Sequence, residues 1–184
     1  WCSKYKIRRY GAHGTSHKYV SIRMNELLGR TDTKLITCHI GNGASISAVK
    51  DGKCVNTSMG LTPNAGLIMG TRCGDIDATI LPYIMNKLNL SGKEMDTIMN
   101  KQSGLLGISG VSSDSRDIEN GIKEGNKRCE LAQRMYVRRI VDYIAKYYVE
   151  LGGCDAIIFT AGVGENSVPV RKEVMQQLKV LGVE

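Results

Sequence analysis

The chain has 184 residues, of which 42% are hydrophobic, enough to build a buried core as one large or two small domains. Its formal net charge is +7, but the basic residues are dispersed and only one Phe and one Trp could stack on bases, which argues against nucleic-acid binding. No apolar run approaches the roughly 20 residues of a membrane helix, and the first residues lack the apolar stretch of a signal peptide. We therefore expect no nucleic-acid or membrane partner, and the positive charge would suit anionic small molecules.

Six cysteines occur singly, at positions 2, 38, 54, 73, 129 and 154. None belongs to a C-x-x-C pair, and only Cys38 has a histidine beside it, so a zinc site is not expected. Unpaired cysteines in apolar or small-residue runs favour a reducing, cytoplasmic location. Because the chain opens on Trp1 rather than Met, we also expect a fragment or a processed form.

A glycine-punctuated loop at 7–17 precedes a helix over about 19–28, where apolar residues recur on one stripe. Thr15 or Ser16 is expected to cap this helix, and Gly29 to end it.

Two histidines of this loop are candidates for chemistry. His13 and His17 are four residues apart, the spacing of a two-histidine metal site, but no third ligand follows. A structural role is therefore expected for His17. His13 lies just before a helix N-terminus, where anions are favoured, and both a structural and a functional role remain open for it.

Two β-prone runs, 35–40 and 44–49, flank the tripeptide Gly41-Asn42-Gly43. Gly and Asn tolerate positive φ in turns, so the pattern predicts a tight hairpin. A second turn at 50–53 leads into 54–58, which gives three antiparallel strands. Glycines also let a ligand approach backbone amides, and Asn42 adds an amide donor, so the turn is either an ordinary hairpin or a phosphate clamp.

The stretch 59–75 contains four glycines and one proline, and it predicts a loop. Arg72, near the end of this loop, could project its planar guanidinium into a cleft. A surface ion pair with Asp75 or Asp77 is the equally acceptable alternative.

The next segments predict mainly helices. One helix is expected from Asp75 to Leu88, and a capping box at Ser91 opens another to about Met99. Residues 103–110 are expected to form a glycine-rich link. Asp114 and Arg116 at the start of a further helix are then interpreted as an N-cap and a surface charge, with a nucleotide contact as the less favoured alternative.

The longest periodic stretch runs from Glu130 to Tyr148 and predicts a scaffold helix. Its expected apolar side consists of Leu131, Met135, Val137, Val141, Ile144, Ala145 and Tyr148. Gly152-Gly153 should stop it, and 154–160 should form a short buried strand. Residues 161–167 then precede a final helix, so the order is strand, Gly-x-Gly, helix, which is typical of a phosphate-binding site. The dinucleotide fingerprint would need a third glycine where Ser167 stands.

Four motifs, in this order, resemble the acetate kinase (acetokinase) family. They are Arg8–His17, Cys38–Ser45, Met69–Asp75 and Phe159–Ser167. The resemblance spans essentially all 184 residues. It implies an α/β fold with the RNase H-like core of the sugar kinase, heat-shock ATPase and actin superfamily, in which a mixed sheet combines an antiparallel meander with parallel strands and helices.

The resemblance also implies residue roles. His13 and Arg72 are similar to the family's transition-state stabilisers, and Asn42 to its contact with the transferring phosphoryl group. The implied nucleotide-binding residues are His39, Ile40, Gly41, Asn42 and Gly43, then Asp114, Ser115 and Arg116, then Gly162, Val163, Gly164, Glu165 and Asn166. One departure is Ala12, where the family pattern has Phe, which removes packing beside His13.

By the same resemblance, residues 1–184 correspond to most of a second, C-terminal, nucleotide-binding domain, without the N-terminal domain and the C-terminal tail. The implied reaction is reversible transfer of the γ-phosphoryl group of ATP to acetate, giving acetyl phosphate, with Mg²⁺ held by residues outside this chain. The implied protein is a cytoplasmic homodimer, and this portion alone would be inactive. Propionate or butyrate stays open as the acceptor.

Three other functions remain open. The chain could be a nucleotide-binding module without activity. It could be a dinucleotide-dependent oxidoreductase, on Gly162-Val163-Gly164 alone, or a basic nucleic-acid binder, on charge alone.

Overall fold

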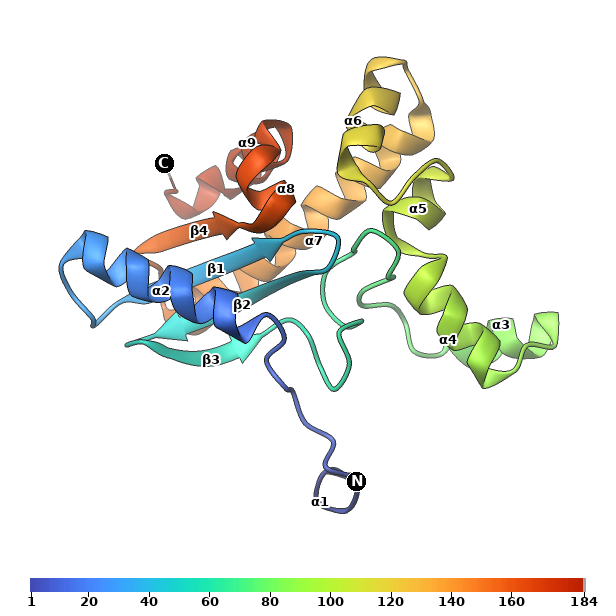
Figure 1. The fold of residues 1–184 in the computed structure, drawn as a ribbon, viewed down its shortest axis with the longest axis horizontal. Coiled ribbons are helices and arrows are strands. Elements are labelled where there is room, and N and C mark those ends of the chain that lie inside the picture. Colours follow the sequence, from blue (N-terminus) through green and yellow to red (C-terminus); the bar gives the residue numbers. More distant parts are fainter. Residues whose placement is uncertain (184) are drawn as a thin grey trace.

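The computed structural model describes residues 1–183 as an α/β molecule built on a four-stranded sheet (Figure 1). The strands are β1 (Lys34–Ile40), β2 (Ala44–Lys50), β3 (Lys53–Thr57) and β4 (Ala156–Thr160), in the order β3-β2-β1-β4. Strand β2 is antiparallel to β1 and β3, whereas β4 is parallel to β1. The expected meander followed by a parallel strand is confirmed.

The helices precede, interrupt and follow this sheet. They are α1 (Cys2–Tyr5), α2 (Gly14–Leu28), α3 (Ile80–Leu88), α4 (Gly92–Lys101), α5 (Gly104–Ser109), α6 (Ser115–Lys123), α7 (Lys127–Leu151), α8 (Ala161–Asn166), α9 (Val168–Leu178) and the short 3₁₀ helix η1 (Lys179–Leu181). Helix α2 covers one face of the sheet and α7 lies behind the other (Figure 1). None of the helices within residues 1–183 combines the length and apolar character needed to cross a bilayer.

The two faces of the sheet differ in polarity because side chains alternate along β1 and β2. The face toward α7 belongs to the hydrophobic core and is formed by Ile36, Cys38, Ile40, Ala44, Ile46 and Ala48. The face toward α2 carries Thr37, His39, Ser45 and Ser47. The first three side chains hydrogen-bond to residues of α2, and the Ser47 hydroxyl donates to Thr57 of β3. A polar layer is therefore buried between the sheet and α2.

The two hairpin turns differ from each other in backbone conformation. Asp51 and Gly52 have φ of 51° and 73°, as a tight two-residue hairpin turn requires. The predicted β1–β2 turn forms, but none of Gly41, Asn42 and Gly43 has a positive φ. The expectation that this turn depends on positive φ was therefore wrong. Cβ atoms added at Gly41 or Gly43 would meet neighbouring atoms only at ordinary contact distances, of 3.4 Å or more.

The expected cap of α2 was also wrong. The helix begins at Gly14, and His13 occupies the N-cap position with φ of 60°. The Ser16 hydroxyl lies instead 2.8 Å from Nδ1 of His39, across on the sheet. The predicted end of the helix at Gly29 is confirmed.

Three further boundaries were wrong. Helix α3 begins at Ile80, because the Asp77 carboxylate accepts hydrogen bonds from the backbone and hydroxyl of Thr79 and forms a turn there. The expected link at 103–110 is the helix α5, anchored by buried Leu105. Residues 161–166 form the helix α8 directly after β4, so the expected loop between strand and helix is absent from this described segment.

The long helix α7 extends further than predicted at both ends, and its buried face is the predicted one only in part: Val137, Val141 and Ile144 are buried, as expected. Leu131 and Met135 are 38% and 41% exposed, whereas the positions after them are buried or half-buried. The residues of α7 that face the core are Cys129, Ala132, Tyr136, Val137, Ile140, Val141, Ile144, Tyr147 and Leu151. Gly152 ends the helix with φ of 67°, as expected.

Candidate active site

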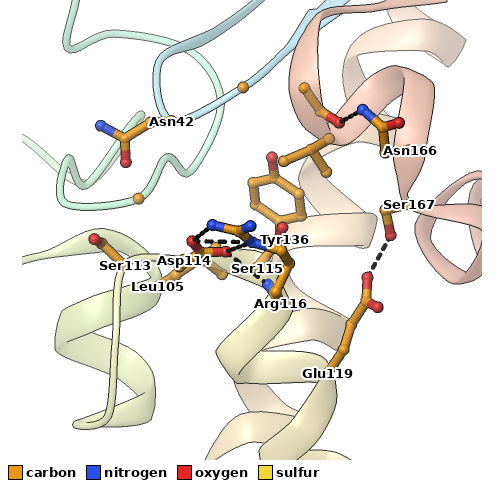
Figure 2. Close-up of a pocket in the computed structure, with 14 residues that line it drawn as sticks. Asn42, Leu105, Ser113, Asp114, Ser115, Arg116, Glu119, Tyr136, Asn166 and Ser167 are labelled. Atoms are coloured by element: carbon orange, nitrogen blue, oxygen red, sulfur yellow. Dashed lines mark hydrogen bonds and ion pairs between the residues drawn. The ribbon is translucent and has the colours of Figure 1, made fainter.

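A cavity of about 730 Å³ opens where β1 and β4 end, at the edge of the sheet to which their parallel direction brings both carboxyl ends. Figure 2 shows its lining side chains converging from the β1–β2 turn, the start of α6, and helices α7 and α8. The lining residues are Gly41, Asn42, Gly70, Leu105, Ser113, Asp114, Ser115, Arg116, Glu119, Tyr136, Gly162, Val163, Asn166 and Ser167. The volume suits a ligand of nucleotide size.

The β1–β2 turn meets both neighbouring segments closely. A Cβ atom on Gly41 would lie 3.7 Å from Cβ of Ala161, at the start of α8. A Cβ atom on Gly70 would lie only 2.0 Å from Oδ1 of Asn42, and the amide of Gly70 donates to the carbonyl of Asn42 at 3.0 Å. Gly70 thus leaves the space that the Asn42 amide occupies at the cavity wall.

Asp114 and Arg116 form the opposite wall (Figure 2). The Asp114 carboxylate accepts from the backbone amide of Arg116 at 2.9 Å, which caps α6, and from the guanidinium at 2.6 Å. These bonds, first of all those from the Arg116 side chain, lower the pKa of Asp114 to about 2. The predicted cap is confirmed, and the same residue lines the cavity.

Helix α8 contributes Gly162, Val163 and Asn166. The amides of its first turn have no partner within the helix, apart from that of Ala161, which donates to Oε1 of Glu165 at 3.1 Å. Asn166 is held by a bond from its Nδ2 to the carbonyl of Gly162 at 2.8 Å. The helix start therefore directs amide groups and a partial positive charge toward this edge of the sheet.

Gly164 and Glu165 do not line the cavity. A Cβ atom on Gly164 would lie 3.6 Å from Cβ of Ile40 and 3.7 Å from the carbonyl of Cys38, so this glycine packs α8 against β1. Glu165 turns back to cap its own helix and also bonds the Thr160 hydroxyl at 3.1 Å. His39, Ile40 and Gly43 likewise lie outside the lining, and Ile40 is fully buried in the core.

His13 and Arg72 meet at the far side of the β1–β2 turn. A Cβ atom on Gly43 would lie 3.4 Å from Nη1 of Arg72 and 3.6 Å from Nε2 of His13. The His13 ring stacks on that of His39 with 4.0 Å between centroids. Both hydrogen bonds of Arg72 side-chain atoms within residues 1–183 use Nη1, to the carbonyl of Pro63 and to Sδ of Met69, so Nη2 and Nε can still donate.

The three histidines form a cluster kept neutral by burial. Desolvation, the nearby His39 and Arg72 lower the pKa of His13 to about 4. Desolvation, His13 and His39 lower the pKa of His17 to about 4, and burial also lowers the pKa of His39. At neutral pH each ring therefore presents one N–H donor and one acceptor nitrogen.

Six of the lining residues were given no site role from the sequence: Gly70, Leu105, Ser113, Glu119, Tyr136 and Ser167. Tyr136 belongs to the buried face of α7 and reaches the cavity floor, and Glu119 of α6 accepts from the Ser167 hydroxyl at 2.5 Å (Figure 2). These contacts join elements that are distant in the chain, so no local pattern reveals them.

The described residues do not make a metal site by themselves. Within residues 1–183, no group of three or more His, Cys, Asp or Glu side chains is placed to hold an ion. Of the cavity's carboxylates, Asp114 is paired with Arg116 and Glu119 is bonded to Ser167. The described residues thus do not fit a preformed Mg²⁺ site.

A model of the acetokinase family matches residues 1–184. The chain belongs to the acetokinase family. Among curated acetokinase-family proteins, the acetate kinase of Treponema denticola is 59% identical over 183 residues, and that of Clostridium novyi is 57% identical, each covering 98% of this chain and 46% of the relative. This acetokinase chain therefore spans about half the length of the curated relatives that it matches.

Solved structures agree with this assignment. An acetate kinase from Porphyromonas gingivalis superposes with a TM-score of 0.96 at 49% identity, over 98% of this chain and 46% of that one. A propionate kinase from Francisella tularensis superposes with a TM-score of 0.94 at 44% identity, over 98% and 47%. The α/β acetokinase fold with its actin-like ATPase core is thereby confirmed for this chain.

Proposed function

We propose that this chain is the nucleotide-binding half of an acetate kinase, an enzyme that moves the γ-phosphoryl group of ATP to acetate and back. The single observation that carries the proposal is the convergence of the β1–β2 turn, the start of α6 and the start of α8 on a cavity of nucleotide size. The names of the relatives, acetate kinase and propionate kinase, support a carboxylate acceptor.

The arrangement suggests where the two ends of the nucleotide lie. Asn42 and the first turn of α8 offer amide donors, so the phosphates belong at this edge of the sheet. The wall with Asp114, Ser115 and Arg116 is then left for the adenosine portion. The turn that reaches the cavity through Asn42 also reaches His13 and Arg72 through Gly43, so the γ-phosphoryl group is expected between them.

The chemistry asked of these residues is alignment and neutralisation of charge. A loose phosphoryl-transfer transition state spreads charge over its equatorial oxygens and needs the attacking and leaving oxygens in line. Arg72 can donate to two such oxygens with its planar guanidinium, and neutral His13 can donate from one ring nitrogen. Mg²⁺ would neutralise phosphate charge, with its protein ligands outside the described residues.

The cytoplasmic homodimer and the assignment of residues 1–184 to a C-terminal domain remain part of this proposal. A nucleotide-binding module without activity is the second candidate, favoured by the chain's covering about half of its relatives. The oxidoreductase interpretation loses its basis, because Gly162 and Gly164 lie inside α8 rather than in a strand-to-helix loop.

The test is an assay of the complete protein that contains this chain, with ATP and with acetate, propionate or butyrate, trapping the acyl phosphate with hydroxylamine. We expect acyl phosphate from acetate, and calorimetry on the same sample should show ADP binding. ADP binding without acyl phosphate from any of the three acids would support the inactive module. No binding of ADP would reject both.

A further inference from the structure

A series of buried hydrogen bonds connects His13 to the interior between α2 and the sheet, and the proposed phosphoryl transfer does not yet account for it. Oγ of Ser45 lies 2.8 Å from Nδ1 of His13 and 2.8 Å from Nε2 of His17. Nδ1 of His17 lies 2.7 Å from Oγ1 of Thr37. Ser45 and Thr37 are fully buried on the sheet face toward α2, and His17 is 5% exposed, so water does not compete for these bonds.

The chain of bonds has a direction, because each neutral imidazole has one donor and one acceptor nitrogen. If Ser45 donates to Nδ1 of His13, its oxygen must accept from Nε2 of His17. Nδ1 of His17 must then accept from the Thr37 hydroxyl. The geometry at Thr37 favours this direction: its hydroxyl lies 2.7 Å from His17, whereas its only other acceptor within residues 1–183, the carbonyl of Ser47, is 3.4 Å away.

This direction leaves the hydrogen of His13 on Nε2, the atom that faces Gly43 and Arg72. The opposite direction would place a lone pair there. Phosphoryl oxygens are acceptors, so only the first arrangement lets neutral His13 donate to them. A lone pair beside the same oxygens would repel them.

We propose that Ser45 and His17 are positioning residues of the phosphoryl transfer, which hold His13 in the tautomer that carries its hydrogen on Nε2. The inference rests on the proposed function, in which His13 donates to the transferring group. Neither residue touches the nucleotide. They act only through the orientation and tautomer of the His13 ring, which His39 supports from its other side by stacking.

The kinetic test uses the complete enzyme with Ser45→Ala and a matched control, Ser47→Ala. Ser47 lies two residues along β2 on the same buried face, but its hydroxyl donates to Thr57 at 3.0 Å rather than to an imidazole. We expect Ser45→Ala to lower kcat by roughly tenfold, the value of one hydrogen bond, with KM for ATP unchanged. Ser47→Ala should keep kcat within about twofold.

A double-mutant cycle separates positioning from general destabilisation. If Ser45 acts through His13, Ser45→Ala should change kcat by less than about twofold in a His13→Ala background. Equal losses in both backgrounds, or equal losses for Ser45→Ala and Ser47→Ala, would overturn the inference. Thr37→Val, which nearly keeps the side-chain volume, provides a second variant with a smaller expected loss of kcat should Ser45→Ala fold poorly.

A spectroscopic test does not depend on activity. In the complete protein labelled with ¹⁵N-histidine, long-range ¹H–¹⁵N correlations should show His13 protonated on Nε2, with the signal assigned by its loss in His13→Gln. Ser45→Ala should give a mixture of tautomers. A His13 hydrogen on Nδ1 in the unmodified protein would overturn the inference even if the enzyme transfers phosphate, whereas the Nε2 form in a protein without transfer activity would leave the inference standing and reject the proposed function.

Discussion

Arg72 is the residue whose chemistry is hardest to replace. Its guanidinium can address two oxygens in one plane, and Lys offers only a point charge on a flexible stem. An arginine that stabilises the transition state of phosphoryl transfer, as proposed for Arg72, is worth about a thousandfold to a hundred-thousandfold in rate. We therefore expect Arg72→Lys to lower kcat of the complete enzyme by at least about a hundredfold, measured by trapping of acyl phosphate. Arg23→Lys, on an exposed ion pair with Glu26 of α2, is the control, and near-normal turnover of Arg72→Lys would contradict the assigned role.

Substitution of Gly43 tests the space between Arg72 and His13 directly. A methyl group on Gly43 would lie at ordinary contact distance from Arg72 and His13, 3.4 and 3.6 Å, so the fold should tolerate it. The methyl group would nevertheless fill the space between the two donors. We expect Gly43→Ala to lower kcat by tenfold or more, in the order of one lost hydrogen bond, while the melting temperature stays within about 2 °C. Gly92→Ala, with nothing within 4 Å of its Cβ position, should change neither.

At this scale, the sequence identified the residues that lie at turns and helix starts. Asn42, Asp114 and Gly162 have local signatures, a glycine-flanked turn, an N-cap and a Gly-x-Gly, and all three line the cavity. Tyr136 has none, because the periodic pattern of α7 gives only an apolar face, and that face was displaced toward Leu131 and Met135. The partners of His13 were equally hidden, since Ser45 is brought to it by strand pairing and by the packing of α2.

Among the elements, the junction between α4 and α5 depends on a glycine whose position has no room for a side chain. Gly104 begins α5 with φ of 64°, and a Cβ atom there would lie 2.2 Å from the carbonyl of Met69. We expect Gly104→Ala to lower the free energy of unfolding by more than about 2 kcal/mol, the upper value for the left-handed backbone alone, as measured by urea denaturation. Gly125 has φ of 81° but nothing within 4 Å, so Gly125→Ala should show the backbone effect without the clash. Equal losses in the two variants would contradict the assigned clash.

The layer between α2 and the sheet should make stability depend on pH. The pKa of His13 and of His17 is about 4 in the folded chain and 6.5 in the unfolded chain. Between these values the unfolded chain binds more protons, so the free energy of unfolding falls as pH falls from 6.5 toward 4. Urea denaturation at about pH 7 and about pH 5 should show this loss.

His17→Gln should reduce that pH dependence, because it removes one of the two groups, and Ser47→Ala should retain it. The pKa of Asp114 is lowered from 3.8 to about 2, so its contribution to the free energy of unfolding is lost only as the pH falls below 3.8. It therefore does not affect the change in stability between pH 6.5 and 4. A pH dependence unchanged by His17→Gln would show that His17 is not kept neutral by the fold.

The elements themselves were predictable where one local rule dominates. The Asp51-Gly52 turn, the capping box at Ser91 and the stop at Gly152 all formed as expected. Helices α5 and α8 were missed because glycines at 104, 107, 162 and 164 lower local helix propensity, and packing against α7 and β1 overrides it.

Considered as a whole, the molecule builds its cavity from segments that belong to separate parts of the chain. A ligand that contacts all of them should stabilise the folded state as one unit. If ADP binds as proposed, ADP at about 100 times its Kd should raise the free energy of unfolding by about 2.7 kcal/mol, measured by urea denaturation of the complete protein. Adenosine at the same concentration should give much less, because it lacks the phosphates that the turn and α8 would bind. Equal stabilisation by both would contradict that placement of the phosphates.

The parallel pairing of β1 with β4 has a consequence for the newborn chain. Leu35 pairs with Ala156, so the meander leaves the ribosome long before its last neighbour has been synthesised. Until then one edge of β1 has unpaired backbone amides and carbonyls, to which a strand of another chain could hydrogen-bond. The cavity cannot exist in that interval, because α8, which lines it, follows β4 directly. Translation must therefore reach α8 before the cavity, and with it the proposed nucleotide site, can form.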